Sequence, residues 1–195
     1  MPFKFNGKLH EHLKTYLHYL SFLPLLYLIP AHVISTGVVA GSSMSPTFNP
    51  GSSKSKDVVL LWKLGVKDPQ NLNLNDVVFL KSPISPDQLY IKRIKAVQGD
   101  KILARYPWGS GNGGKLSNVG GMNGSTNSNQ VLIPRGHIWV EGDNVHSIDS
   151  NTYGSVSSGM VVGKAVWRIW PPQRWGPIES TGGRECRVKH LQYSL

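Results

Sequence analysis

The chain has 195 residues and a formal net charge of +10, with 21 lysines and arginines against 11 acidic residues. This length predicts one folded domain with some additional sequence. The 39% hydrophobic content and six tryptophans exclude a wholly disordered chain, which would be poorer in such residues. The basic residues form no run of five or more. The charge therefore predicts a basic solvated surface, compatible with anionic membrane lipid, and no nucleic acid partner.

The amino-terminal part of the chain combines a basic tail with an apolar segment. Residues 1–15 form the tail, and from Thr15 to Ser53 there is no Asp, Glu, Lys or Arg. The apolar part, residues 16–38, is close to the ~20 residues needed to cross a bilayer and predicts one transmembrane helix. The basic side should face the compartment of synthesis, with the rest of the chain across the membrane.

A cleaved secretory signal is the alternative, because Val38-Val39-Ala40 satisfies the small-residue rule for cleavage. The apolar stretch exceeds the ~7 to 15 residues of a signal core, which favours the membrane anchor. Pro24 and Pro30, together with His18 and His32, interrupt the segment. We therefore expect a bent helix or one packed against a partner.

Beyond Gly41, short runs of Val, Ile, Leu and Trp alternate with Asn, Pro, Gly and Asp, which predicts strands and turns. A mainly β domain is expected over residues 39–178, followed by a C-terminal tail at 179–195. Residues 107–130 are so rich in Gly, Asn and Ser that they predict a flexible, exposed insertion. A tight hairpin turn is expected at Gln98-Gly99-Asp100. The predicted strands are 57–62, 77–81, 89–97, 101–106, 137–141 and 161–170.

A hydroxyl group stands directly after the apolar segment, in the sequence Gly41-Ser42-Ser43-Met44-Ser45-Pro46-Thr47. Gly and Pro shape such a turn, so a nucleophile there would lie at the membrane surface and meet membrane-borne peptides. The same composition also suits a linker, because Ser, Pro and Thr populate turns for purely conformational reasons. This segment alone leaves both interpretations open.

The strand predicted over residues 89–97 contains a lysine among apolar neighbours. Alternation places Lys92 on the same face as Tyr90, Ile94 and Ala96. Burial disfavours the ammonium form and can lower the pKa of a lysine from ~10.4 by several units, which suits a general base near neutral pH. The alternative for Lys92 is an exposed charge on an edge strand that discourages aggregation.

A third segment, residues 142–156, is dense in side-chain donors and acceptors, as positioning loops are. The three segments read Gly-x-Ser-Met-x-Pro-Thr, then Tyr-Ile-Lys-Arg with Gly-Asp shortly after, then Gly-Asp-Asn-x-x-x-Ser-x-Asp-Ser-x-x-Tyr-Gly. In order and rough spacing they resemble the type I signal peptidases. The resemblance runs from about Thr36 to Trp175 and fits best with the mitochondrial inner membrane branch of that family.

The resemblance implies a signal-peptidase-like coiled β-sheet catalytic domain behind one N-terminal transmembrane helix. It makes Ser43 the nucleophile of an acyl-enzyme mechanism and Lys92 the general base, with Ser147 hydrogen-bonded to the Lys92 amine. Asp149 would support the loop without taking part in the chemistry. Its family partner is an arginine two residues later, but position 151 is Asn. We expect amide hydrogen bonds at best in place of that charge pair.

The surroundings of the nucleophile depart from the family pattern at one position. Relatives often carry a hydroxyl two residues before the nucleophile, where Gly41 stands here. Another group, with Ser42 as a candidate, would have to complete the oxyanion hole, in which one donor contributes ~2.7 to 4 kcal/mol. Met44 follows the nucleophile as the motif requires. No metal or cofactor is implied, and His146, alone among the histidines in a motif loop, is expected to face solvent.

The resemblance also implies a function, the removal of N-terminal sorting peptides from proteins delivered to the mitochondrial intermembrane space. It implies a single-pass protein of the inner membrane, in complex with a homologous subunit 1. Two other interpretations stay open. One is an inactive membrane-held partner that stabilises an active homologue, and the other is a soluble Ser-Lys autoprotease of the repressor type, against which the apolar segment argues.

Overall fold

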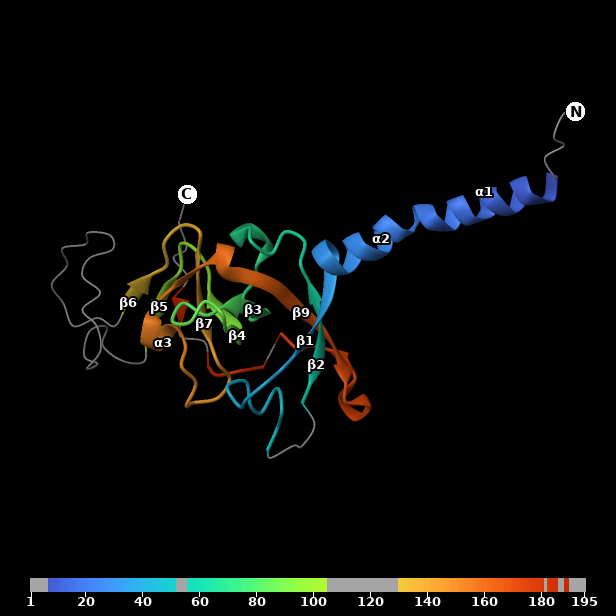
Figure 1. The fold of residues 1–195 in the computed structure, drawn as a ribbon. Helices are drawn as coiled ribbons and strands as arrows, with labels where there is room; N and C mark the ends of the chain where they lie inside the picture. Colours follow the sequence, from blue (N-terminus) through green and yellow to red (C-terminus); the bar gives the residue numbers. More distant parts are fainter. Residues whose placement is uncertain (1–6, 52–55, 105–129, 181, 186–187, 190–195) are drawn as a thin grey trace, which may run out of the picture.

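A computed structural model describes residues 7–51, 56–104, 130–180, 182–185 and 188–189. It consists of a β domain and a helical arm that leads away from it (Figure 1). The predicted insertion at 107–130 lies, except for Gln130, outside the described residues. The last two positions of the strand predicted over 101–106 also lie outside them.

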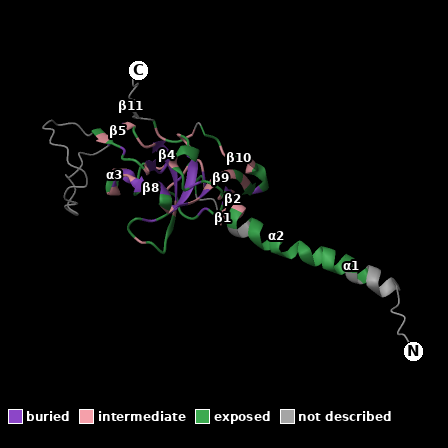
Figure 2. Cartoon of the chain, turned by 90° about the horizontal axis from the view of Figure 1, so that it is seen from above, coloured by how far each residue is buried: buried purple, intermediate pink, exposed green. Residues whose placement is uncertain are grey.

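The arm is built from the apolar amino-terminal segment. One residue, Phe22, separates helix α1 (Gly7–Ser21) from α2 (Leu23–Leu28), because Pro24 lacks the N–H that a continuous helix would use. A π-helical turn, η1 (Ile29–Val33), contains Pro30 and leads into the first strand. Figure 2 shows the described residues of α1 and α2 coloured as exposed. Among them are the large apolar residues Tyr16, Leu17, Tyr19, Leu20, Phe22, Leu23, Leu26, Tyr27 and Leu28.

The described helices differ from the single span predicted over residues 16–38. Residues Ile34–Val38, the last part of that range, form strand β1 and pair with β2 (Val58–Trp62) in antiparallel register, Ile34 opposite Trp62. Within the described part of the chain, no individual helix combines the length and the apolar character that crossing a membrane needs. β-branched residues at Ile34, Thr36 and Val38 suit the strand that replaces the end of the predicted helix.

The domain is organised around one antiparallel sheet. Its strand order is β1-β2-β9-β3-β4-β7-β8, and β10 pairs with β9. A smaller sheet has the order β11-β5-β6. The further strands of the main sheet are β3 (Val77–Lys81), β4 (Leu89–Ala96), β7 (His137–Glu141), β8 (Val156–Ser157), β9 (Val161–Trp170) and β10 (Gly176–Pro177). Those of the smaller sheet are β5 (Lys101–Leu103), β6 (Gln130–Leu132) and β11 (Val188–Lys189).

Short helical turns complete the chain between strands. They are η2 (Pro69–Asn71), α3 (Ser150–Tyr153), η3 (Ser158–Met160) and η4 (Pro172–Arg174). The central strand β3 is buried on both faces, since Val77 and Phe79 pack into one apolar cluster while Val78 and Leu80 pack into another. A continuous apolar run is what such a two-sided strand requires. The mainly β fold expected from the sequence is confirmed. Strand β4 lies inside the sheet, between β3 and β7.

Candidate active site

The loop between β1 and β2 carries the Ser43 hydroxyl and is anchored to the hydrophobic core by two of its own apolar side chains. Met44 and Phe48 are almost fully buried in the cluster that also contains Val39. Burial of side chains of this size contributes about 1.5 to 3 kcal/mol each, so the loop is fixed as part of the core. Ser43 itself remains half-buried, and Ser42 is exposed.

Asn49 closes this loop onto the sheet. Its Nδ2 donates to the carbonyl oxygens of Val39 at 2.9 Å and Gly41 at 3.1 Å. Its Oδ1 accepts from the Asp57 N–H at 2.8 Å, and its own N–H donates to Asp57 Oδ2 at 2.9 Å. Asn49 has a φ of 47°, a conformation that Asn tolerates better than most residues.

Asp57 is fully buried and anchors Asn49 because two arginines offset its charge. Arg174 contacts Asp57 Oδ1 at 2.6 Å and donates to Oδ2 at 3.1 Å. Arg168 lies 3.9 Å from Oδ2 and donates to the Thr47 carbonyl at 2.7 Å. Strand β9 and turn η4 thus hold the loop that presents Ser43.

Gly41 occupies a backbone conformation that side chains disfavour, with a φ of 77°. A Cβ at this position would meet no atom within 4 Å, so the restriction comes from the backbone alone. Any side chain at position 41, including one with a hydroxyl, would therefore be strained in this chain. The oxyanion hole expected near Ser42 stays a prediction.

Lys92 enters the site from strand β4 and is 3% exposed. Its Nζ donates to Ser147 Oγ at 2.6 Å and lies 5.6 Å from the centre of the Tyr90 ring. Burial lowers the pKa of Lys92 to about 8, with Asp149 and Asp143 raising it and Arg184 lowering it further. Burial on β4 excludes the alternative of an exposed edge-strand charge.

The loop after β7 is folded directly against the loop between β1 and β2, which carries Ser43 and is called the nucleophile loop below. The Asn144 N–H donates to the Ser43 carbonyl at 3.0 Å, and Asn144 Nδ2 donates to the Ser42 carbonyl at 3.0 Å. Gly142 is needed at this contact, since a Cβ there would collide with Ser147 and approach the Ser43 carbonyl oxygen to 2.5 Å. The two loops therefore fix the backbone of Ser43 and the hydroxyl of Ser147 relative to each other.

Asp149 connects several backbone and side-chain groups of this second loop. It caps α3 by accepting from the Asn151 N–H at 3.1 Å, and Oδ2 accepts from the Gly142 N–H at 3.1 Å. Asn151 Nδ2 also donates to Asp149 Oδ1 at 2.9 Å. The expectation that amide hydrogen bonds alone replace the charge pair is wrong, because Arg184 lies 3.2 Å from Asp149 Oδ2.

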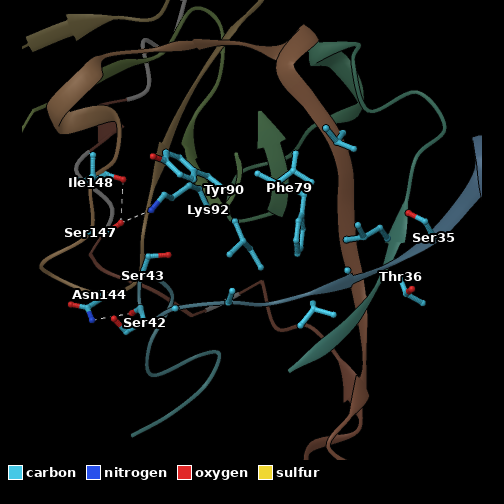
Figure 3. A pocket seen from close by; sticks show the side chains of 18 of the residues that line it. Ser35, Thr36, Ser42, Ser43, Phe79, Tyr90, Lys92, Asn144, Ser147 and Ile148 are labelled. Carbon is cyan, nitrogen blue, oxygen red and sulfur yellow. Dashed lines mark hydrogen bonds between the residues drawn. The ribbon is translucent and has the colours of Figure 1, made fainter. Parts of the chain in front are cut away.

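The three loop and strand segments meet at one open cavity of about 770 Å³. Figure 3 shows Ser43, Lys92 and Ser147 together at one end of this cavity, with the Lys92 amine directed toward Ser147. The edge strand β1 lines it with residues 35–38, and apolar side chains such as Phe79 line the remainder. His146 is exposed, as expected, and borders the same cavity. In the described ranges, no three His, Cys, Asp or Glu side chains gather as a metal site would require.

Sequence reasoning missed the residues that hold the site from outside the three motifs. Arg174 lies near the end of the Thr36 to Trp175 range over which the sequence resembles the family, but no motif there gave it a role. Asp57 begins a predicted strand, and Asn49 lies in a polar turn, where single residues are hard to rank. Arg184 lies in a polar tail with no motif, and only the tertiary fold brings it to Asp149.

The chain is similar to known proteins along most of its length. Residues 10–170 match the family model described as signal peptidase, peptidase S26. Mitochondrial inner membrane protease subunit 2 of Saccharomyces cerevisiae is 42% identical over 94% of this chain and 95% of the yeast protein. The protein of the same name from Schizosaccharomyces pombe is 37% identical over 86% of this chain and 82% of its own length. Mitochondrial ATP-independent inner membrane protease subunit 1a of Arabidopsis thaliana is 35% identical over 80% of this chain and 83% of the plant protein.

Proposed function

Since this chain belongs to the signal peptidase family, peptidase S26, we propose that it is a membrane-bound serine endopeptidase with Ser43 as nucleophile and Lys92 as general base. Its substrates are proteins delivered to the mitochondrial intermembrane space, from which it removes N-terminal sorting peptides. The location in the inner membrane and the complex with a homologous subunit 1 rest on the names of the relatives, which call them inner membrane protease subunits. The apolar residues exposed along α1 and α2 support the membrane anchor.

The observation that carries the catalytic assignment is the buried amine of Lys92 in the cavity that also contains Ser43. With a pKa of about 8, roughly a tenth of the amine is unprotonated at pH 7, and that form can accept a proton. Ser147 Oγ accepts one N–H of the amine, which leaves the nitrogen lone pair free to turn toward the Ser43 hydroxyl.

The reaction then proceeds in two halves. Ser43 Oγ attacks the scissile carbonyl while Lys92 takes the hydroxyl proton, and the ammonium returns that proton to the leaving amine as the acyl-enzyme forms. The unprotonated Lys92 next removes a proton from water as the water attacks the ester. The ammonium returns that proton to Ser43 Oγ when the C–O bond of the ester breaks and the second product leaves. N–H groups in the nucleophile loop, that of Ser43 first, stabilise the oxyanion.

A peptide substrate is supported by the edge strand that borders the cavity. Within the described part of the chain, β1 pairs with β2 on one side only, so its other side offers backbone N–H and C=O groups to an extended chain. Residues 35–38 of this strand line the cavity that leads to Ser43. An extended peptide added at β1 would pass its backbone across the hydroxyl.

Ser43→Ala in the assembled membrane complex tests this function. Cleavage of precursor proteins that depend on this chain should fall to background, while Ser85→Ala, in the turn between β3 and β4, should leave it unchanged. N-terminal sequencing of the mature products measures both. Normal processing by the Ser43→Ala complex would show that the chain only supports an active homologous subunit.

A further inference from the structure

The C-terminal segment beyond the β domain packs against the candidate active site. Arg93, which neighbours Lys92 on β4, binds Asp143 through two parallel hydrogen bonds of 3.0 and 2.9 Å. The same guanidinium donates to the carbonyl of Glu179 at 3.0 Å. Gly183 crosses over this pair so closely that a Cβ there would lie 2.6 Å from Asp143 Oδ1 and 2.8 Å from Arg93 Nε. The segment therefore packs closely against the Arg93–Asp143 pair, and position 183 must be glycine because no side chain fits there.

The packing of this C-terminal segment places Arg184 against the loop that carries Ser147. Its side chain is only 8% exposed, and it contacts three groups of that loop. Arg184 Nε donates to the Gly142 carbonyl at 2.8 Å, one guanidinium N–H donates to the Asn144 carbonyl, and the same nitrogen lies 3.2 Å from Asp149 Oδ2. Gly142 and Asn144 are the residues that meet the nucleophile loop.

We propose that Arg184 is a positioning residue of the active site, supplying from the C-terminal segment the cation that pairs with Asp149 and fixes the Ser147 loop against Ser43. The role follows from geometry, since one planar guanidinium joins two carbonyls and a buried carboxylate. Without it, Asp149 would keep amide contacts but lose this direct ion pair, and breaking a buried ion pair by removing one partner is costly. This inference rests on the proposed function, because it assigns Arg184 to the same site.

The charge of Arg184 also reaches Lys92. The charged and titratable groups around this amine are Tyr90 on its own strand, Asp143 and Asp149 in the loop after β7, His146 at the cavity, and Arg184. Asp149 and Asp143 raise the pKa of Lys92, whereas Arg184 lowers it. Removal of Arg184 therefore leaves the carboxylates to hold the ammonium form, and the amine becomes a base only at higher pH.

The test compares Arg184→Gln with Arg135→Gln, the same change at an exposed arginine in the turn before β7, in the assembled membrane complex. For Arg184→Gln, kcat/KM should fall further at pH 7 than at pH 9.5, because the acid limb of the pH profile moves to higher pH. Each unit of that movement lowers the unprotonated fraction at pH 7 about tenfold. A merely structural loss would lower the rate equally at both pH values. An unchanged profile for Arg184→Gln overturns the proposal.

A second variant keeps the test decisive if Arg184→Gln does not fold. Asn151 Nδ2 already lies 2.9 Å from Asp149 Oδ1, so an arginine at position 151 can reach the same carboxylate from its own loop. Asn151→Arg combined with Arg184→Gln should restore both the folded yield and the pH profile of the unsubstituted chain. A double variant no better than Arg184→Gln overturns the proposal. If the unsubstituted complex and Arg135→Gln also fail to cleave, the proposed function itself has failed.

Discussion

Lys92 is 3% exposed and donates to Ser147, so its proton affinity is set by the fold more than by solvent. Because its pKa is lowered to about 8, the ammonium loses its proton as pH rises through that value. We expect kcat/KM to rise with pH up to a plateau above pH 8 in the assembled complex. Lys92→Arg should abolish turnover across this whole range, since a guanidinium keeps its proton. A rate independent of pH between 6 and 9 would contradict the base assignment.

The same residue should reduce the stability of the fold at neutral pH. The pKa of Lys92 is lowered from 10.5 in the unfolded chain to about 8 in the folded chain. Above pH 10.5 the amine is neutral in both states and costs the fold nothing. As pH falls from 10.5 through 8, the unfolded chain binds the proton more readily, and the fold loses stability. This shift corresponds to about 3 kcal/mol. The free energy of unfolding of Lys92→Met, relative to the unsubstituted chain, should be higher at pH 7 than at pH 10.5 by about that amount. Urea unfolding in detergent at both pH values measures it, and an equal difference at both would count against a lowered pKa.

At the scale of elements, the nucleophile loop depends on a strand and a turn far away in the sequence. Asp57 joins Asn49 to Arg174, and its side chain is fully buried. Asp57→Ala should lower the free energy of unfolding by about 3 kcal/mol, the lower end for a broken buried pair, because Arg174 is partly exposed. The matched change Asp87→Ala, at an exposed aspartate, should cost under about 0.5 kcal/mol. Equal denaturation midpoints for the two variants would refute the role of Asp57.

The contact between the two site loops depends on the absence of a side chain at Gly142. A Cβ there would collide with Ser147 and lie 2.5 Å from the Ser43 carbonyl oxygen, so Gly142→Ala must push the loops apart. We expect activity to fall at least about a hundredfold, as displacements of about 1 Å at reacting groups do. Gly159→Ala, at an exposed glycine whose Cβ would meet only Ser157 Oγ at 3.4 Å, should keep activity. Comparable rates for both would show that the loops adapt.

The sequence predicted the elements whose pattern is strong and local. The runs at 57–62, 77–81, 89–97, 137–141 and 161–170 correspond within a residue to β2, β3, β4, β7 and β9. Strand β1 was missed because its residues continue the apolar segment of the arm, and composition alone does not separate an apolar strand from the end of a helix. The two-residue strands have too few positions to show alternation. Arg184 could not be found because its partner lies 35 residues away and only the fold joins them.

At the scale of the whole molecule, the arm and the domain are joined without a linker. The π-helical turn ends at Val33, and β1 begins at Ile34. A shortened chain that begins at Ile34 therefore keeps every strand that the structure describes and lacks the arm. We expect the full chain to stay in the membrane pellet after carbonate extraction and the shortened chain to enter the supernatant with unchanged β-sheet circular dichroism. Release of the full chain would remove the anchor from the proposed function.

The adjacency of Lys92 and Arg93 on β4 has a consequence for how the chain reaches its native pairing. Lys92 lies opposite Val78 and Arg93 opposite Val77, and neighbouring side chains of a strand point to opposite faces. A slip of one residue between β3 and β4, in the direction that puts Arg93 in the place of Lys92, would put Ile94 in the place of Arg93. A guanidinium would then lie at the candidate active site, and Asp143 would lose its pair of hydrogen bonds. This slipped register leaves the buried carboxylate of Asp143 unpaired, so the Arg93–Asp143 pair favours the native register, in which Lys92 lies beside Ser147.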